Sequence, residues 1–110
     1  MNGVVSAFQL WDRVGLDSQP AVQALAAADP NVADKAEWML VHGGPSVLPA
    51  VREALGSRNE TVKKRAIRIV AWQGDLGALQ PLRVIQQTDP EDVELAAWAM
   101  EKIETLHPKL

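Results

Sequence analysis

The sequence predicts an all-α fold built from stacked helix pairs. Three observations support this fold: an apolar helical stripe that recurs about every 30 residues, turn residues between the apolar segments, and a composition rich in Ala, Val and Leu with only 5% aromatic residues. Residues of the stripe stand at i, i+4 and i+7, which is one face of an α-helix. The four copies are Val4, Phe8 and Trp11; Val32, Ala36 and Met39; Val62, Ala66 and Ile69; and Val93, Ala97 and Met100.

A second series of apolar residues lies between the copies of the stripe. Its clearest member runs from Val47 to Leu55 with the spacing of an amphipathic helix, and an earlier one contains Val22 and Leu25. Each repeat is therefore expected to hold a first helix, called A, and a second helix, called B. The predicted helices cover residues 3–14, 18–28, 31–42, 46–56, 60–73, 76–87 and 90–106.

Capping residues and glycines mark the predicted helix ends. Asp29 and Asp89 each precede a proline, which is tolerated in the first turn of a helix, and Asn59 and Asp75 offer oxygens at two further starts. Glycines end helices readily because they adopt the left-handed conformation. Such breaks are expected at Gly15, Gly43, Gly44, Gly56 and Gly74. No alternating apolar and polar run competes with this pattern, so we expect no sheet.

Composition and charge restrict the class of protein. A length of 110 residues with 47% hydrophobic content suits one domain, expected to span 1–110. The chain has no Cys, which excludes thiol nucleophiles, disulfides and Cys-ligated metals. A formal charge of −3 gives no overall attraction to phosphate backbones or anionic lipid, and no apolar run approaches the roughly 18 residues of a spanning helix. We expect a cytoplasmic protein with no nucleic-acid and no membrane partner.

The stretch from Asn59 to Ile103 combines several repeat features: an amide or acidic cap, a valine with basic residues, an alanine, a Gly-Asp turn and a Leu-rich second helix. In these features it resembles the bacterial HEAT-like repeats related to those of phycobilin lyases. The pattern covers residues 31–106 well and residues 3–28 loosely.

The resemblance implies a short right-handed α-solenoid with seven helices, in which A helices line the convex side and B helices the concave side. Its repeats would cover 3–28, 31–56 and 60–87, with a terminal helix over 90–106. The commonest role of such repeats is gripping a partner protein. We therefore expect a module that binds a protein or peptide through the concave B-helix face, in an adaptor, regulatory or inhibitor role of the immunity type.

Catalysis by side chains needs a base close to a nucleophile, or paired carboxylates across a pocket. His42 and His107 both lie near predicted helix ends. Members similar to deoxyhypusine hydroxylase hold iron with His-Glu pairs, whereas here Gly43 and Pro108 follow the histidines. We expect no enzyme, no catalytic residue, no metal and no cofactor. The alternative is a lyase-like or chaperone-like helper for a cofactor-bearing protein, which would need an apolar cleft with oriented polar groups.

Aligned positions on the B helices form columns across the predicted inner face. Gln23, Arg52 and Arg83 are equivalent in this alignment. An arginine column suits carboxylates because guanidinium groups make planar, bidentate pairs; the alternative is a solvated helix face. The predicted partner contacts on this face are Gln23, Arg52, Glu53, Arg83 and Gln87.

Tryptophan is enriched at binding hot spots. Trp11 lies on the apolar stripe and Trp72 lies close to it, so both are expected in the core. Trp38 and Trp98 lie off the stripe and are predicted partner contacts. In the terminal helix, Leu95 and Trp98 are expected either to pack on the preceding helices or to form a docking or homodimer surface.

The most basic stretch of the chain contains Arg58, Lys63, Lys64, Arg65 and Arg68. If these side chains all faced one way, they could contact phosphates. In the repeat alignment, however, Lys63 corresponds to Glu94 of the next A helix and Lys64 to Asp34 of the previous one. A basic helix between two acidic ones favours charge pairing between repeats.

Overall fold

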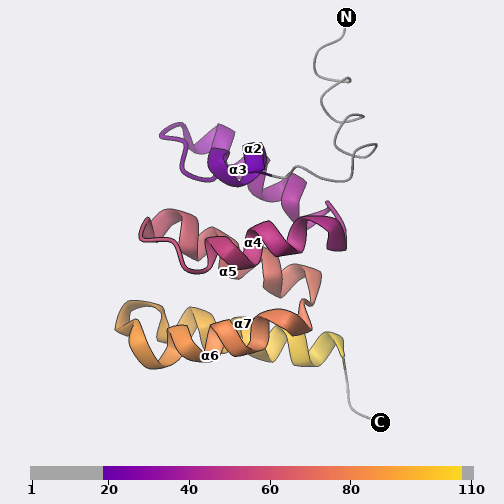
Figure 1. The fold of residues 1–110 in the computed structure, drawn as a ribbon, viewed down its shortest axis with the longest axis vertical. Helices are drawn as coiled ribbons and strands as arrows, with labels where there is room; N and C mark the ends of the chain where they lie inside the picture. Colours follow the sequence, from indigo (N-terminus) through magenta and orange to yellow (C-terminus); the bar gives the residue numbers. More distant parts are fainter. Residues whose placement is uncertain (1–18, 108–110) are drawn as a thin grey trace, which may run out of the picture.

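The computed structural model describes residues 19–107, which form three successive helix pairs stacked along the long axis of the molecule (Figure 1). The α-helices of this part of the chain are α2 (Gln19–Ala24), α3 (Pro30–Val41), α4 (Leu48–Ala54), α5 (Glu60–Gln73), α6 (Leu79–Thr88) and α7 (Val93–Leu106). No strand occurs among them, so the predicted all-α fold is confirmed. The helix predicted over 3–14 lies outside the described residues.

Three of these helices begin with a short 3-10 turn. The 3-10 helices are η1 (Pro45–Val47), η2 (Leu76–Ala78) and η3 (Pro90–Asp92), which precede α4, α6 and α7. With these entry turns included, the observed elements agree with the predicted ranges to within a few residues at each end. From residue 19 to residue 107, no helix has the length and apolar character needed to cross a bilayer.

The helices form two layers. α3, α5 and α7 lie side by side in one layer, and α2, α4 and α6 make up the other. A cluster of buried apolar side chains fills the space between the layers, from Leu25 at the end of α2 to Ile103 in α7. α5 is the central helix of its layer and is buried on several sides. Its buried side chains are Val62, Lys63, Ala66, Ile67, Ile69, Val70 and Ala71.

Most predicted caps are present. Asp29 Oδ1 accepts a hydrogen bond from the backbone N–H of Asn31 at 2.9 Å, and Asn59 Oδ1 accepts one from Thr61 N–H at 3.0 Å. Gly74 ends α5 with a φ of 68°, which is the left-handed conformation expected there. Asp89 differs, because its carboxylate makes no cap and instead lies 2.7 Å from the ammonium of Lys63.

The prediction that the apolar stripe is buried in every repeat is only partly correct. Val62, Ala66 and Ile69 of α5 are buried as predicted, but Val32 is 47% exposed and Val93 is 37% exposed. The deeply buried residues of the two flanking helices share only Ala36 with the predicted stripe. They are Ala33, Ala36 and Leu40 in α3, and Ala96, Ala99 and Ile103 in α7. A central helix buries more than one face, whereas a flanking helix buries chiefly the face toward its neighbours.

Charge pairing between repeats is observed along α5, as predicted for the basic stretch. Toward α3, Arg65 Nη1 lies 2.9 Å from Asp34 Oδ1 and 2.8 Å from Glu37 Oε1. Glu37 also receives two bonds of 2.9 Å from Arg68, through Nε and Nη2. Arginines of α5 are therefore bound to carboxylates of α3, as the hypothesis of charge pairing between repeats predicts.

Toward α7, the pairing is buried. Asp92 is fully buried, and its two oxygens lie 2.9 Å from Lys63 Nζ and 2.7 Å from Lys64 Nζ. Burial alone would raise the pKa of Asp92, but hydrogen bonds from both lysines lower it overall. Burial would likewise lower the pKa of Lys63, yet hydrogen bonds to Asp89, Glu60 and Asp92 raise it above its ordinary value. Both groups therefore stay charged at neutral pH.

A polar contact also joins the ends of α3 and α5. The amide Nε2 of Gln73 donates hydrogen bonds to the carbonyl oxygens of Leu40 at 2.8 Å and Gly44 at 3.0 Å. These carbonyls belong to the last turn of α3 and the loop after it, where helix carbonyls lack partners within the helix. Gln73 therefore holds the two helices together at the end opposite to the Asp34–Arg65 pair.

Candidate partner-binding surfaces

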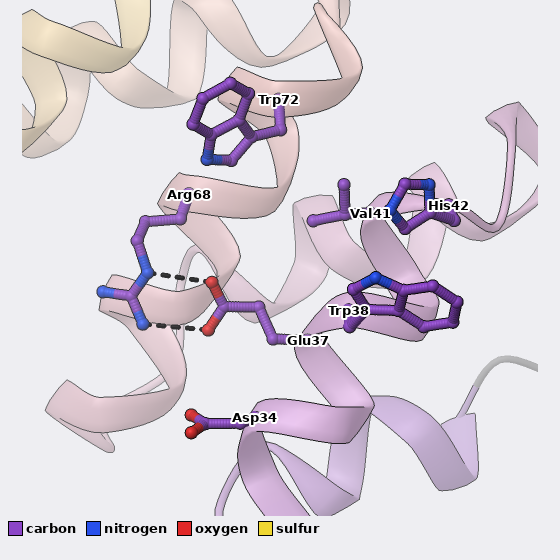
Figure 2. A pocket seen from close by; sticks show the side chains of 7 residues that line it. All are labelled: Asp34, Glu37, Trp38, Val41, His42, Arg68 and Trp72. Carbon is purple, nitrogen blue, oxygen red and sulfur yellow. Dashed lines mark hydrogen bonds and ion pairs between the residues drawn. The ribbon is translucent and has the colours of Figure 1, made fainter.

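A groove of about 540 Å³ runs between α3 and α5 on the outer side of their layer. Figure 2 shows Trp38 and His42 projecting from α3 on one side and Trp72 from α5 on the other, with Val41 between the two indole rings. The Glu37–Arg68 pair links the two helices to one side of the rings. We call this feature the tryptophan groove. It is lined by Asp34, Glu37, Trp38, Val41, His42, Arg68 and Trp72.

Both tryptophans of the groove are accessible to solvent. Trp38 is 58% exposed and Trp72 is 52% exposed. Trp38 lies two residues from buried Ala36, and a helix turns by about 200° over two residues, so its side chain points away from the core. Its ring contacts that of His42, with centroids 4.6 Å apart and an angle of 48° between the planes.

The prediction that Trp72 belongs to the core is wrong. Trp72 follows Arg68 by four residues, and residues at this spacing share a helix face, so it stands on the charged outer face of α5. That spacing was the signal in the sequence that could have placed it. Trp11, the other tryptophan expected in the core, lies outside the described residues.

Trp72 connects the tryptophan groove to α7. Its ring meets that of Trp98 edge to face, with centroids 6.1 Å apart. The ammonium of Lys102 lies 4.3 Å from the centroid of the Trp72 ring, a distance typical of a cation–π contact. Trp98 and Leu95 are only partly buried and pack against the apolar core. This agrees with the expectation that the terminal helix packs on the preceding helices. A homodimer surface there stays a prediction.

The five contacts predicted on the B helices all lie on exposed positions of the second layer. Gln23 and Glu53 line a groove of about 230 Å³ between α2 and α4, and Arg52 and Glu53 line a groove of about 390 Å³ between α4 and α6. The structure thus brings three of the five residues onto two successive grooves. Arg83 and Gln87, on α6, line neither of these two grooves.

Arg52 is already bound within the chain. Its Nε and Nη2 donate to the two oxygens of Asp75 at 2.7 and 2.6 Å, a bidentate pair that joins α4 to the residue preceding η2, at the start of the second helix of the next repeat. The hydrogen bond to Asp75 raises the pKa of Arg52, although burial acts the other way. Any partner that uses Arg52 must therefore share it with Asp75.

Stacked helix pairs with polar contacts between equivalent helices, and with grooves between neighbouring repeats, define an α-helical repeat protein. The family model for HEAT repeats matches residues 18–101. The chain therefore belongs to the HEAT-repeat family, as the resemblance in the sequence indicated. Searches of curated proteins and of solved structures found no significant match.

Proposed function

We propose that this HEAT-repeat chain is a non-catalytic module that holds a partner protein in the tryptophan groove between α3 and α5. HEAT repeats generally mediate protein–protein interaction. The observation that carries the choice of surface is the exposure of two indole rings, Trp38 and Trp72, more than half of each accessible and both lining one groove. Exposed aromatic groups gathered in a groove are typical of binding sites.

The size of the effect follows from the exposed area. An indole side chain buries roughly 200 Å² when fully covered, so a partner would cover roughly 100 Å² more on each ring. At about 25 cal/mol per Å², this contributes up to about 2.5 kcal/mol per ring. Replacing either tryptophan by alanine should then weaken partner binding by up to about 60-fold.

A second candidate surface is the B-helix layer, and with it the predicted concave face. The observation in its favour is that Gln23, Arg52 and Glu53 line two successive grooves between helices of neighbouring repeats. Arg83 lies at an exposed position of α6 in the same layer. It makes the cleaner probe of this face, since replacing Arg52 would also disturb its pair with Asp75.

Affinity capture from the source organism with three baits separates the two surfaces. The baits are the wild type, a Trp38→Ala/Trp72→Ala variant and an Arg83→Glu/Gln87→Ala variant, each checked for an unchanged helical circular-dichroism spectrum. We expect a partner that the tryptophan variant loses and the Arg83 variant keeps. A partner lost only with the Arg83 variant would move the site to the B-helix layer, and a partner kept by both variants would contradict both surfaces.

A further inference from the structure

The helices α3, α5 and α7 can be compared position by position, counting from the residue that precedes each of them. These residues are Asp29, Asn59 and Asp92. The seventh position after each one is a buried alanine of the core. The three alanines are Ala36, Ala66 and Ala99. Equivalent positions of the three helices therefore have the same direction relative to the core.

The sixth position faces the preceding helix of the layer. In α5 it is Arg65, whose Nη1 lies 2.8 Å from Glu37 Oε1 of α3. In α7 it is Trp98, whose ring meets that of Trp72 of α5 at a centroid distance of 6.1 Å. The equivalent residue of α3 is Lys35, which is exposed. In the part of the chain that the structure describes, α3 is the first helix of its layer, so this flank has no neighbour there (Figure 1).

The uncovered flank of α3 includes large apolar side chains. At the third position, Val32 is 47% exposed, whereas the equivalent Val62 of α5 is 8% exposed. At the ninth position, Trp38 is 58% exposed, and Figure 2 shows its ring on the side of α3 that faces away from α5. The equivalent residue of α5 is Arg68, which bonds back to Glu37 of α3. The end repeat of a solenoid normally presents a polar outer face, so an apolar flank at this end indicates that something covers it.

The segment that precedes α2 has the sequence of such a cover. Val4, Phe8 and Trp11 stand at i, i+4 and i+7, the spacing of one apolar helix face. Gly15 follows, and α2 begins at Gln19, which leaves a short connection. Connections of this length make successive helices antiparallel neighbours. Because α2 packs against α3, a helix that leads into α2 from the layer of α3 would lie along the uncovered flank.

We propose that residues 3–14 form a helix that packs on this flank, against Val32 and Trp38, and so completes the first repeat of the stack. Its short connection to α2 gives the segment a high effective concentration at the flank, which a separate partner lacks. Arg68, packed beside α3 at the position equivalent to Trp38, keeps 36% of its side chain exposed. Trp38 can therefore be covered on one flank and still line the tryptophan groove. This inference goes beyond the proposed function and does not depend on it.

Hydrogen–deuterium exchange of the full chain, measured by mass spectrometry, tests the contact. The test variant is Val32→Asp, and the matched control is Val84→Asp, since Val84 is a valine of α6 with 46% exposure. A carboxylate in the first turn of α3 is favourable for the helix dipole, so α3 should stay intact, which its own amides verify. We expect the amides of residues 3–14 to be protected in the wild type. Their protection should fall at least about tenfold in Val32→Asp and stay unchanged in Val84→Asp.

Cross-linking identifies where the segment lies. The chain has no Cys, so the pair Gln9→Cys/Lys35→Cys can be joined by a short bifunctional thiol reagent. In the repeat alignment Gln9 corresponds to Glu37 and Lys35 to Arg65, which are in contact in the next repeat. We expect a cross-link within one molecule for this pair. The control pair Gln9→Cys/Arg83→Cys should form none, because Arg83 lies on α6 in the other layer.

The remaining outcomes would overturn the inference. Residues 3–14 that exchange freely in the wild type would show that the flank is bare, and protection that Val32→Asp leaves unchanged would show that the segment packs elsewhere. An absent cross-link, or one that the control pair forms equally, would contradict the position. A cross-link formed only between two molecules would assign the flank to a second copy of the chain. Each of these outcomes leaves the tryptophan groove to be judged by the capture experiment.

Discussion

Removing the buried carboxylate of Asp92 should destabilise the stack of repeats more than removing any other carboxylate that pairs with α5. Asp92 lies at the start of α7 and binds Lys63 and Lys64 of α5. In Asp92→Asn the shape of the side chain is kept, but the negative charge is lost and an amide N–H₂ is brought toward two ammonium groups. The variant thus isolates the electrostatic part of the contact.

The magnitude follows from burial. Breaking a buried ion pair by removing one partner typically costs about 3–5 kcal/mol. Lys63 retains Glu60 and Asp89 at 2.7 Å each, so it is not left unpaired. We therefore expect a loss near the lower limit, about 3 kcal/mol. For a domain of this size that corresponds to a fall of roughly 15 °C in Tm.

Urea denaturation followed by circular dichroism measures this loss. The matched control is Glu60→Gln, which removes a carboxylate from the same lysines at a position that is 43% exposed, and which should cost less than about 1 kcal/mol. The double variant Lys63→Met/Asp92→Asn should lose less than the sum of the two single variants. Equal, small losses in Asp92→Asn and Glu60→Gln would refute the reasoning that burial strengthens this pair.

Three further predictions concern stability. Ala66→Asp should cost about 4 kcal/mol or more, because the carboxylate would enter the fully buried contact between α5 and its neighbours, and a wild-type melting temperature would contradict the assignment of that face. The pKa values of Asp89 and Asp92 are lowered by hydrogen bonds from lysines, so the folded state gains stability above the ordinary carboxyl pKa of about 4 and loses it as the pH falls through the lowered values. The free energy of unfolding should be level between about pH 7 and 5 and fall below about pH 4, with a shallower fall in Asp92→Asn; an unaltered acid limb in that variant would exclude Asp92 as a cause. Gly74→Ala should cost about 1–2 kcal/mol because Gly74 has a φ of 68° and a new Cβ would lie 3.2 Å from His107 Nε2 and from Leu106 Cδ1; Gly56→Ala, whose Cβ would meet only Glu53 O at 3.5 Å, is its neutral control.

The local signals of the sequence predicted the helices well. Asp29, Asn59 and Gly74 act at helix ends as their chemistry requires, because capping depends on a few adjacent residues and not on the rest of the chain. Asp89 does not cap its helix, because its position is determined by a residue far away in the sequence. A lysine that is distant in the sequence, Lys63, comes within 2.7 Å of its carboxylate and binds it instead.

The candidate site was predicted less completely. Trp38 was identified as exposed because it lies off the apolar stripe, but Trp72 was assigned to the core since it lies close to the stripe and is apolar. Whether an aromatic residue is covered depends on which neighbour packs over it, and that is a property of the stacked repeats. The buried position of Asp92 was missed for the same reason, although the alternation of basic and acidic A helices had indicated that charges would pair between repeats.

The contacts that hold α3 against α5 affect how a partner would bind. The Glu37–Arg68 pair joins α3 to α5 beside the two tryptophans, and the Gln73 amide joins the ends of the same helices. The distance between the two walls is thus determined within the chain, so little ordering entropy should be lost when a ligand arrives. Association would resemble docking onto a rigid surface, and substitutions of the indole rings should act mainly on the dissociation rate. Glu37 would then affect affinity through the geometry of the groove as well as through its own contacts, since a change at Glu37 would alter the spacing of the walls that the ligand has to bridge.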